Sequence, residues 1–114
     1  MSTKFIKVVT DFHNKPYGRY VTDGPGCDLT SGEVFRKKIL APALRQYDEV
    51  SVDLTGYNRY GRSFLDEAFG GLIREEGFTK SDLLPRLTYK HDLIPSIEKL
   101  IDDRVDAAER ERVS

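Results

Sequence analysis

Apolar residues of this chain alternate with polar ones in one clear segment. Val50, Val52 and Leu54 lie at every second position, which predicts a strand over residues 49–54. Short β-branched and aromatic runs predict three further strands, over residues 4–9, 17–22 and 87–90. The run at 17–22 is expected to pair with the first strand as a hairpin.

Apolar positions with helical spacing predict three helices, over residues 30–47, from Ser63 to about Gly77, and over 94–110. Glycine is a common residue just past a helix end, so Gly77 is the expected stop of the second helix. Pro95 falls in the first turn of the third, where proline is tolerated. A short helical turn is expected over residues 79–84.

The first of these helices contains two local signals. Thr30-Ser-Gly-Glu33 has the form of a capping box, in which the Thr30 hydroxyl and the Glu33 carboxylate satisfy free backbone amides. Pro42 lies inside the helical pattern and removes one backbone donor, so we expect a kink or the end of the regular helix there.

The predicted order is β-β-α-β-α-β-α. Helical crossovers between strands favour parallel pairing, and the first hairpin adds an antiparallel edge. We therefore expect an α/β fold, with helices packed on a small mixed four-stranded sheet. Residues 1–114 are expected to form one domain, and residues 106–114, which are strongly charged, are expected to fray into solvent.

Composition excludes several classes of function. The net charge of -1 argues against a general nucleic-acid-binding surface. The single cysteine, Cys27, cannot form an internal disulfide, and no apolar run approaches a membrane span, so a cytoplasmic protein is expected. Neither a nucleic acid nor a membrane is an expected partner.

The sequence lacks the residue patterns of metal and acid–base sites. His13 and His91 are far apart and show no ligand spacing. Asp53 ends a predicted strand and Asp66 begins a helix, but carboxylates there more often cap backbone amides than act in catalysis. We expect no metal site, no cofactor and no enzymatic activity.

Ser63 precedes an apolar helix, and the run Ser63-Phe-Leu-Asp66 allows two interpretations. In the first, the Ser63 side chain accepts from the Asp66 amide as a helix cap. In the second, Ser63 is a phosphorylation site at a helix N-terminus, with Arg59 and Arg62 to hold the phosphate and Asp66 and Glu67 to oppose it.

Two features near Ser63 favour contact with another protein. Gly70-Gly71 lies in mid-helix, where glycine is costly, and indicates either close packing within the fold or a flat face for a partner. Aromatic and basic residues precede Ser63, and such residues are frequent interface anchors; they are Tyr57, Arg59, Tyr60 and Arg62. One of the two tyrosines is expected to be half-buried.

The segment DLTGYNRYGRSFLDEAFGGLIREEGF, with TSGEVFRKKILAPAL upstream, resembles STAS-like bacterial domains of unknown function. Those domains are similar to anti-sigma-factor antagonists of the STAS fold. The resemblance covers about residues 15–105, and SFLDEAFGGL is its most specific part. It implies the same α/β fold as the strand and helix pattern.

Anti-sigma-factor antagonists carry an Asp-Ser-Ser-Gly-Leu run whose first serine an ATP-dependent kinase phosphorylates. In register with that run, Gly61 occupies the aspartate position and Arg62 the position of the phosphorylated serine. Ser63 matches the second serine and alone keeps a hydroxyl.

The resemblance implies a regulatory module that docks on a partner with a histidine-kinase-type ATPase domain or on an anti-sigma-like protein. The expected docking residues are Tyr57, Arg59, Tyr60, Arg62, Asp66, Glu67, Gly70 and Gly71. The alternative is a domain that senses a small ligand or nucleotide and uses the helix N-terminus as an anion site.

Overall fold

The computed structural model describes residues 2–114. Its elements are, in order, β1 (Thr3–Lys7), α1 (Val8–Asp11), α2 (Cys27–Thr30), α3 (Gly32–Phe35), η1 (Arg36–Leu40), α4 (Ala41–Gln46), β2 (Glu49–Asp53), α5 (Arg62–Leu65), η2 (Asp66–Gly70), α6 (Gly71–Arg74), α7 (Lys80–Leu83), β3 (Leu87–Lys90) and α8 (Ser96–Val113). The elements η1 and η2 are π-helical turns. Each lies inside a continuous helix, α3-η1-α4 and α5-η2-α6.

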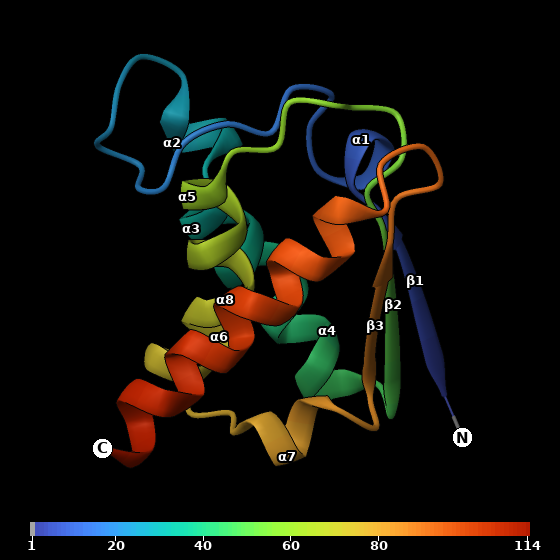
Figure 1. Ribbon diagram of the computed structural model, residues 1–114. Helices are drawn as coiled ribbons and strands as arrows, with labels where there is room; N and C mark the ends of the chain where they lie inside the picture. Colours follow the sequence, from blue (N-terminus) through green and yellow to red (C-terminus); the bar gives the residue numbers. More distant parts are fainter. Residues whose placement is uncertain (1) are drawn as a thin grey trace.

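The sheet has three strands in the order β1-β2-β3, and all of them are parallel. The prediction of a mixed four-stranded sheet is therefore wrong in strand number and direction, whereas the α/β class is confirmed. The long helices lie on one side of the sheet (Figure 1). On the other side Phe5 is 73% exposed, beside Ser51 and Thr88 in the register.

The predicted strand over residues 17–22 is instead a loop of bends and turns. Gly18 has a φ of 93°, which breaks an extended run. Side chains take up the backbone donors that a strand partner would need: the Asp23 carboxylate accepts from the amides of Arg19 and Tyr20. The Glu33 carboxylate accepts from the Val21 amide.

Two other boundaries differ from the prediction. β1 ends at Lys7 rather than at residue 9, because the Asp11 carboxylate accepts from the Lys7 amide and closes the turn of α1. At the other end of the chain α8 continues to Val113, so the segment 106–114, for which fraying is expected, is mostly helical.

The first long helix begins one residue later than the capping-box pattern predicts. Ser31 is the N-cap, and its hydroxyl accepts from the Val34 amide. The Thr30 hydroxyl instead donates to the Tyr17 carbonyl. Pro42 does not end this helix; the π-helical turn η1 comes directly before α4, so the irregularity expected from proline lies N-terminal to it.

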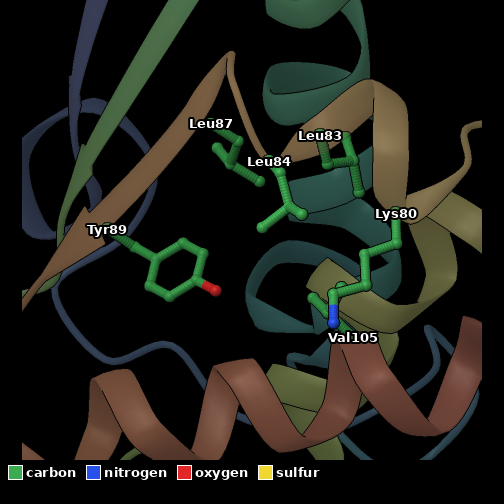
Figure 2. Close-up of a pocket in the computed structure, with 6 residues that line it drawn as sticks. All are labelled: Lys80, Leu83, Leu84, Leu87, Tyr89 and Val105. Carbon is green, nitrogen blue, oxygen red and sulfur yellow. The ribbon is translucent and has the colours of Figure 1, made fainter.

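Apolar side chains from the helices fill the space over the inner face of the sheet. Phe35, Phe64 and Phe69 form the aromatic centre of this core and are at most 1% exposed. Leu83, on α7, and Leu87, on β3, close the end of this core that α7 covers (Figure 2). Among residues 2–114 no helix combines the length and the apolarity needed to cross a membrane.

Candidate functional site

The turn between β2 and α5 is shaped by local hydrogen bonds and one glycine. The Asp53 carboxylate accepts from the Thr55 amide as the chain leaves β2. Gly56 has a φ of 107°, and a Cβ there would lie 3.0 Å from the Val9 side chain. The turn ends at Gly61, the N-cap of α5, and leaves Arg59, Arg62 and Ser63 exposed.

The two tyrosines of the turn do not lie in an exposed patch as predicted. Tyr60 is 8% exposed and belongs to the core, whereas Tyr57 is partly buried against it. Their rings pack edge to face with centroids 5.2 Å apart. Burial and the nearby Asp53 charge raise the pKa of the Tyr60 hydroxyl, which has no hydrogen-bond partner in the described structure. Tyr60 therefore positions the turn and offers no outward contact.

His91 holds the turn against the segment after β3. Its side chain is 1% exposed, and Nε2 lies 2.9 Å from the Tyr57 carbonyl oxygen. The other ring nitrogen, Nδ1, accepts from the amides of Leu93 and Ile94, so Nε2 carries the proton and donates. His91 is thus a structural residue, and no group of potential ligands among residues 2–114 is arranged to hold a metal ion.

Ser63 does not cap the helix. Gly61 is the N-cap, and the Asp66 amide donates to the carbonyl oxygens of Arg62 and Ser63 rather than to the Ser63 hydroxyl. The capping interpretation is therefore wrong. Ser63 lies in the exposed first turn of the helix, next to Arg62.

The loop over residues 13–30, which ends in the short helix α2, lies beside this turn. A groove of about 410 Å³ separates the two and is lined by His13, Lys15, Tyr17, Pro25, Gly26, Leu29, Thr30 and Tyr57. Tyr17 and Leu29 are 66% and 60% exposed, and Tyr20 and Val21 in the same loop are also exposed. We call Lys15, Tyr17, Leu29, Tyr57, Arg59 and Arg62 the loop–turn surface. The sequence does not predict its loop half, because the residue pattern over 17–22 predicts a strand.

Hydrogen bonds to the first long helix fix the conformation of this loop. The amides of Gly32 and Glu33 donate to the carbonyl oxygens of Gly18 and Arg19. Cys27 is 1% exposed, and its Sγ would lie 2.8 Å from a Cβ at Gly18. The backbone that carries the exposed side chains of the loop is thus held in place by hydrogen bonds to the helix and by the buried Cys27.

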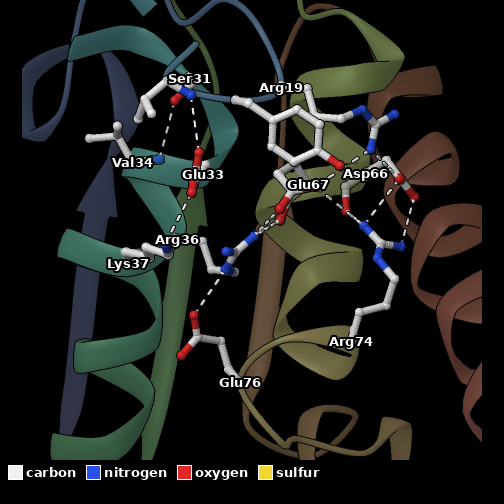
Figure 3. A network of polar contacts seen from close by, with 12 residues as sticks. Arg19, Ser31, Glu33, Val34, Arg36, Lys37, Asp66, Glu67, Arg74 and Glu76 are labelled. Carbon is white, nitrogen blue, oxygen red and sulfur yellow. Dashed lines mark hydrogen bonds and ion pairs between the residues drawn. The ribbon is translucent and has the colours of Figure 1, made fainter. Parts of the chain in front are cut away.

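A network of ion pairs lies beneath the loop–turn surface, between the two π-helical turns (Figure 3). Arg36, on η1, is 2% exposed, and its Nη1 lies 2.5 Å from Glu67 Oε2 on η2. Arg19, from the loop, pairs with Asp66 at 2.6 Å, and Arg74 pairs with Asp66 at 3.1 Å. These ion pairs connect the loop to the helix α5-η2-α6, and that helix to α3-η1-α4.

Ion pairing in this network shifts the pKa of Asp66 and that of Arg36 in the directions that keep both groups charged. Burial alone raises the pKa of Asp66, but the bonds and charges of Arg19 and Arg74 outweigh it and hold the pKa below its usual value. Burial likewise lowers the pKa of Arg36, but hydrogen bonds to Glu67 and Glu76 outweigh that effect and raise it. Asp66 is therefore a carboxylate and Arg36 a cation at neutral pH.

Four predicted docking residues are buried inside the molecule. Asp66 and Glu67 are 9% and 4% exposed and are paired with arginines. A Cβ at Gly71 would lie 2.4 Å from Arg36 Nη1, and one at Gly70 would lie 3.2 Å from the Arg104 carbonyl on α8. The glycine pair makes room for an arginine and a neighbouring helix, so packing within the fold explains it. These four residues do not form an exposed face.

The chain resembles one family of known proteins. A family model described as a STAS-like domain of unknown function matches residues 31–92, more than half of the chain. That range contains the helices α3-η1-α4 and α5-η2-α6, the turn and Ser63, whereas α8 lies outside it. Neither the curated proteins nor the solved structures contain a significant match.

Proposed function

Because the chain belongs to the family of STAS-like domains of unknown function, we propose that it is a cytoplasmic regulatory module that binds a protein partner. The loop–turn surface is the observation that carries this proposal. It combines exposed Tyr17 and Leu29 with exposed Arg59 and Arg62 beside a groove. Tyrosine and arginine are residues that concentrate binding energy at protein interfaces.

The charge and shape of the surface support a partner of complementary chemistry. Lys15, Arg59 and Arg62 are exposed cations at its rim, so the partner presents carboxylates there. Tyr17 and Leu29 frame the groove and receive an apolar side chain between them. A protein with a histidine-kinase-type ATPase domain, or an anti-sigma-like protein, is the proposed partner.

The proposed role involves no catalysis by the chain itself. The two carboxylates of the helix that follows the turn, Asp66 and Glu67, are held by Arg19, Arg36 and Arg74. A carboxylate whose pKa is lowered by such pairing is a poor proton acceptor, so Asp66 is unsuited to act as a general base.

Ser63 is the proposed site of regulation. It is exposed, it does not cap the helix, and it lies at the positive end of the helix dipole beside Arg62. A phosphate on Ser63 would add negative charge to the basic rim and oppose a partner that presents carboxylates. Intact mass after co-expression with an ATPase-type kinase tests this; one added phosphate that Ser63→Ala abolishes is expected.

Affinity capture followed by a binding measurement tests the docking surface. The wild-type chain is used to capture proteins from the native cytosol, and the dissociation constant of the purified partner is then measured. Arg59→Ala with Arg62→Ala is expected to weaken binding about tenfold or more. The control is Lys99→Ala with Arg110→Ala, which removes two exposed cations of α8. Equal affinity for all three chains would refute the docking surface.

A further inference from the structure

A second groove lies away from the loop–turn surface, between β3, α7 and α8 (Figure 2). Two adjoining hollows share Lys80, Leu84, Tyr89 and Val105, and the larger has a volume of about 270 Å³. Leu83, Leu84, Leu87 and Val105 give it an apolar floor. Leu84 is 68% exposed, although it lies next to the core residue Leu83. The groove therefore offers an apolar side chain a place to be buried.

The backbone along this groove is a free sheet edge. β3 is the last strand of the order β1-β2-β3. The amides of Val50 and Leu54 donate to the carbonyl oxygens of Arg86 and Lys90, so the polar groups of alternate residues of β3 point toward β2. Those of Leu87 and Tyr89 point the other way, where no strand of residues 2–114 pairs with them.

The far side of the groove carries negative charge. Glu98, Asp102 and Asp106 recur at every fourth residue of α8 and thus lie on one ridge of the helix. The Tyr89 hydroxyl donates to Asp102, and Lys80 pairs with Asp106 at 2.6 Å. Among residues 2–114, Lys80 is the one basic residue that lines either hollow, so the carboxylates of the ridge outnumber the cations.

We propose that this groove binds an extended peptide of a partner protein, which adds as a fourth strand to β3. Its backbone would pair with the free groups of Leu87 and Tyr89, as in other cases of strand addition to a sheet edge. One apolar side chain would enter the hollow beside Leu84 and Val105. A lysine or arginine next to it in the peptide would face Asp102 and Asp106.

The charges disfavour two other occupants. An acidic peptide would meet the carboxylates of α8. A second copy of the chain that paired through its own β3 would bring its α8 to the same side of a continuous sheet. The ridge with Asp102 and Asp106 would then face its own counterpart, and like charges would repel.

The test uses the full chain and a phage-displayed library of random peptides. Peptides are selected on the immobilised protein, and the most enriched one is synthesised with a fluorescent label for anisotropy. We expect a consensus of an apolar residue beside lysine or arginine. Leu84→Asp and, separately, Asp106→Lys should each weaken binding about tenfold, whereas Leu93→Asp, at a leucine that is 73% exposed outside the groove, should not.

Hydrogen exchange locates the peptide on the protein. Binding should protect the amides of Leu87 and Tyr89, which pair with no strand in the free chain. The proposal is overturned if no peptide is enriched over a surface without protein, or if the consensus is acidic. It is also overturned if Leu84→Asp and Asp106→Lys bind as tightly as the wild type, or if protection falls only on residues 13–30 and 56–62. Because the groove shares no residue with the loop–turn surface, its failure leaves the proposed docking surface standing.

Discussion

Arg19 Nη1 lies 2.6 Å from Asp66 Oδ2, and this pair joins the loop over residues 13–30 to the second π-helical turn. Arg19 is 27% exposed and Asp66 12% exposed at their side chains, so water screens the contact only in part. The exposed loop is thus anchored to a buried charge of the helix that follows the turn. The loop half of the loop–turn surface is therefore bound to the helix α5-η2-α6, and the turn half leads directly into that helix.

Arg19→Met should loosen this loop. The substitution keeps the apolar stem but removes the pair, and we expect a loss of about 1 kcal/mol in the free energy of unfolding. Amide exchange should become faster over residues 17–23 and stay unchanged in β2. Arg112→Met, which breaks an exposed pair with Glu109, serves as the control. Unchanged exchange in the loop would show that Arg19 does not hold it.

Glu67→Gln should destabilise the chain strongly. It leaves the buried Arg36 guanidinium without the carboxylate that lies 2.5 Å away. Breaking a buried pair at one partner typically costs about 3–5 kcal/mol, although Glu76 still pairs with Arg36 and makes the lower value the expected one. Urea denaturation measures the effect.

The double variant Arg36→Met with Glu67→Leu separates charge from packing. It removes both charges and fills the space with apolar atoms, so it should be closer in stability to the wild type than Glu67→Gln is. If the double variant were the less stable of the two, the ion pair itself would contribute more than its apolar replacement.

Gly71→Ala should destabilise the fold even though alanine favours helices. Its Cβ would lie 2.4 Å from Arg36 Nη1 and 3.0 Å from Arg36 Cδ, and displacing a buried arginine costs about 1–3 kcal/mol. Gly24→Ala is the matched control, because nothing lies within 4 Å of a Cβ there. Thermal unfolding compares the two, and a Gly71→Ala chain as stable as the wild type would contradict this account of the glycine pair.

The stability of the chain should fall in acid through Asp66 and Glu76. Arginine contacts outweigh burial and hold the pKa of both carboxyls below its usual value. The unfolded chain then binds more protons as the pH falls from about 5, so the stabilisation is complete above that pH and decreases below it. Urea denaturation across this range should show a shallower decline for Asp66→Asn. An equal slope in both chains would exclude Asp66 as a source.

Nucleotides and inorganic phosphate should leave the thermal midpoint of the chain unchanged. A binding module whose ATP chemistry belongs to its partner has no need of its own nucleotide site. A rise in the midpoint that Arg59→Ala and Arg62→Ala abolish would favour the alternative, a sensor domain with an anion site at the N-terminus of α5. Ligand binding to the folded state alone raises the midpoint.

Hydrophobic periodicity correctly predicted the elements that bury one apolar face in the core. The alternation of Val50, Val52 and Leu54 and the stripe after Ser63 correspond to β2 and to the α5-η2-α6 helix. The loop at Tyr17–Thr22 has strand-like residues, but the nearby carboxylate of Asp23 and the more distant one of Glu33 take its backbone donors. The contact with Glu33 spans 12 residues of the chain. No local pattern shows such a contact.

Ion pairs between residues distant in sequence also explain why the buried carboxylates of the site could not be predicted. Asp66 and Glu67 are polar residues at the start of a helix, which in general indicates exposure. Their burial depends on arginines at positions 19, 36 and 74 that the fold brings together. Gly70-Gly71 was the one local sign, because a glycine pair in mid-helix indicates a close neighbour. The second π-helical turn, η2, has no sign of its own in the sequence, whereas Pro42 indicates an irregularity in the helix that contains η1.

Hydrogen exchange of the chain with and without its captured partner tests whether the loop–turn surface is the docking site. We expect protection on binding over residues 13–30 and 56–62, with little change in the exposed part of α8. Protection confined to other segments, with these two unchanged, would contradict the loop–turn surface as the docking site.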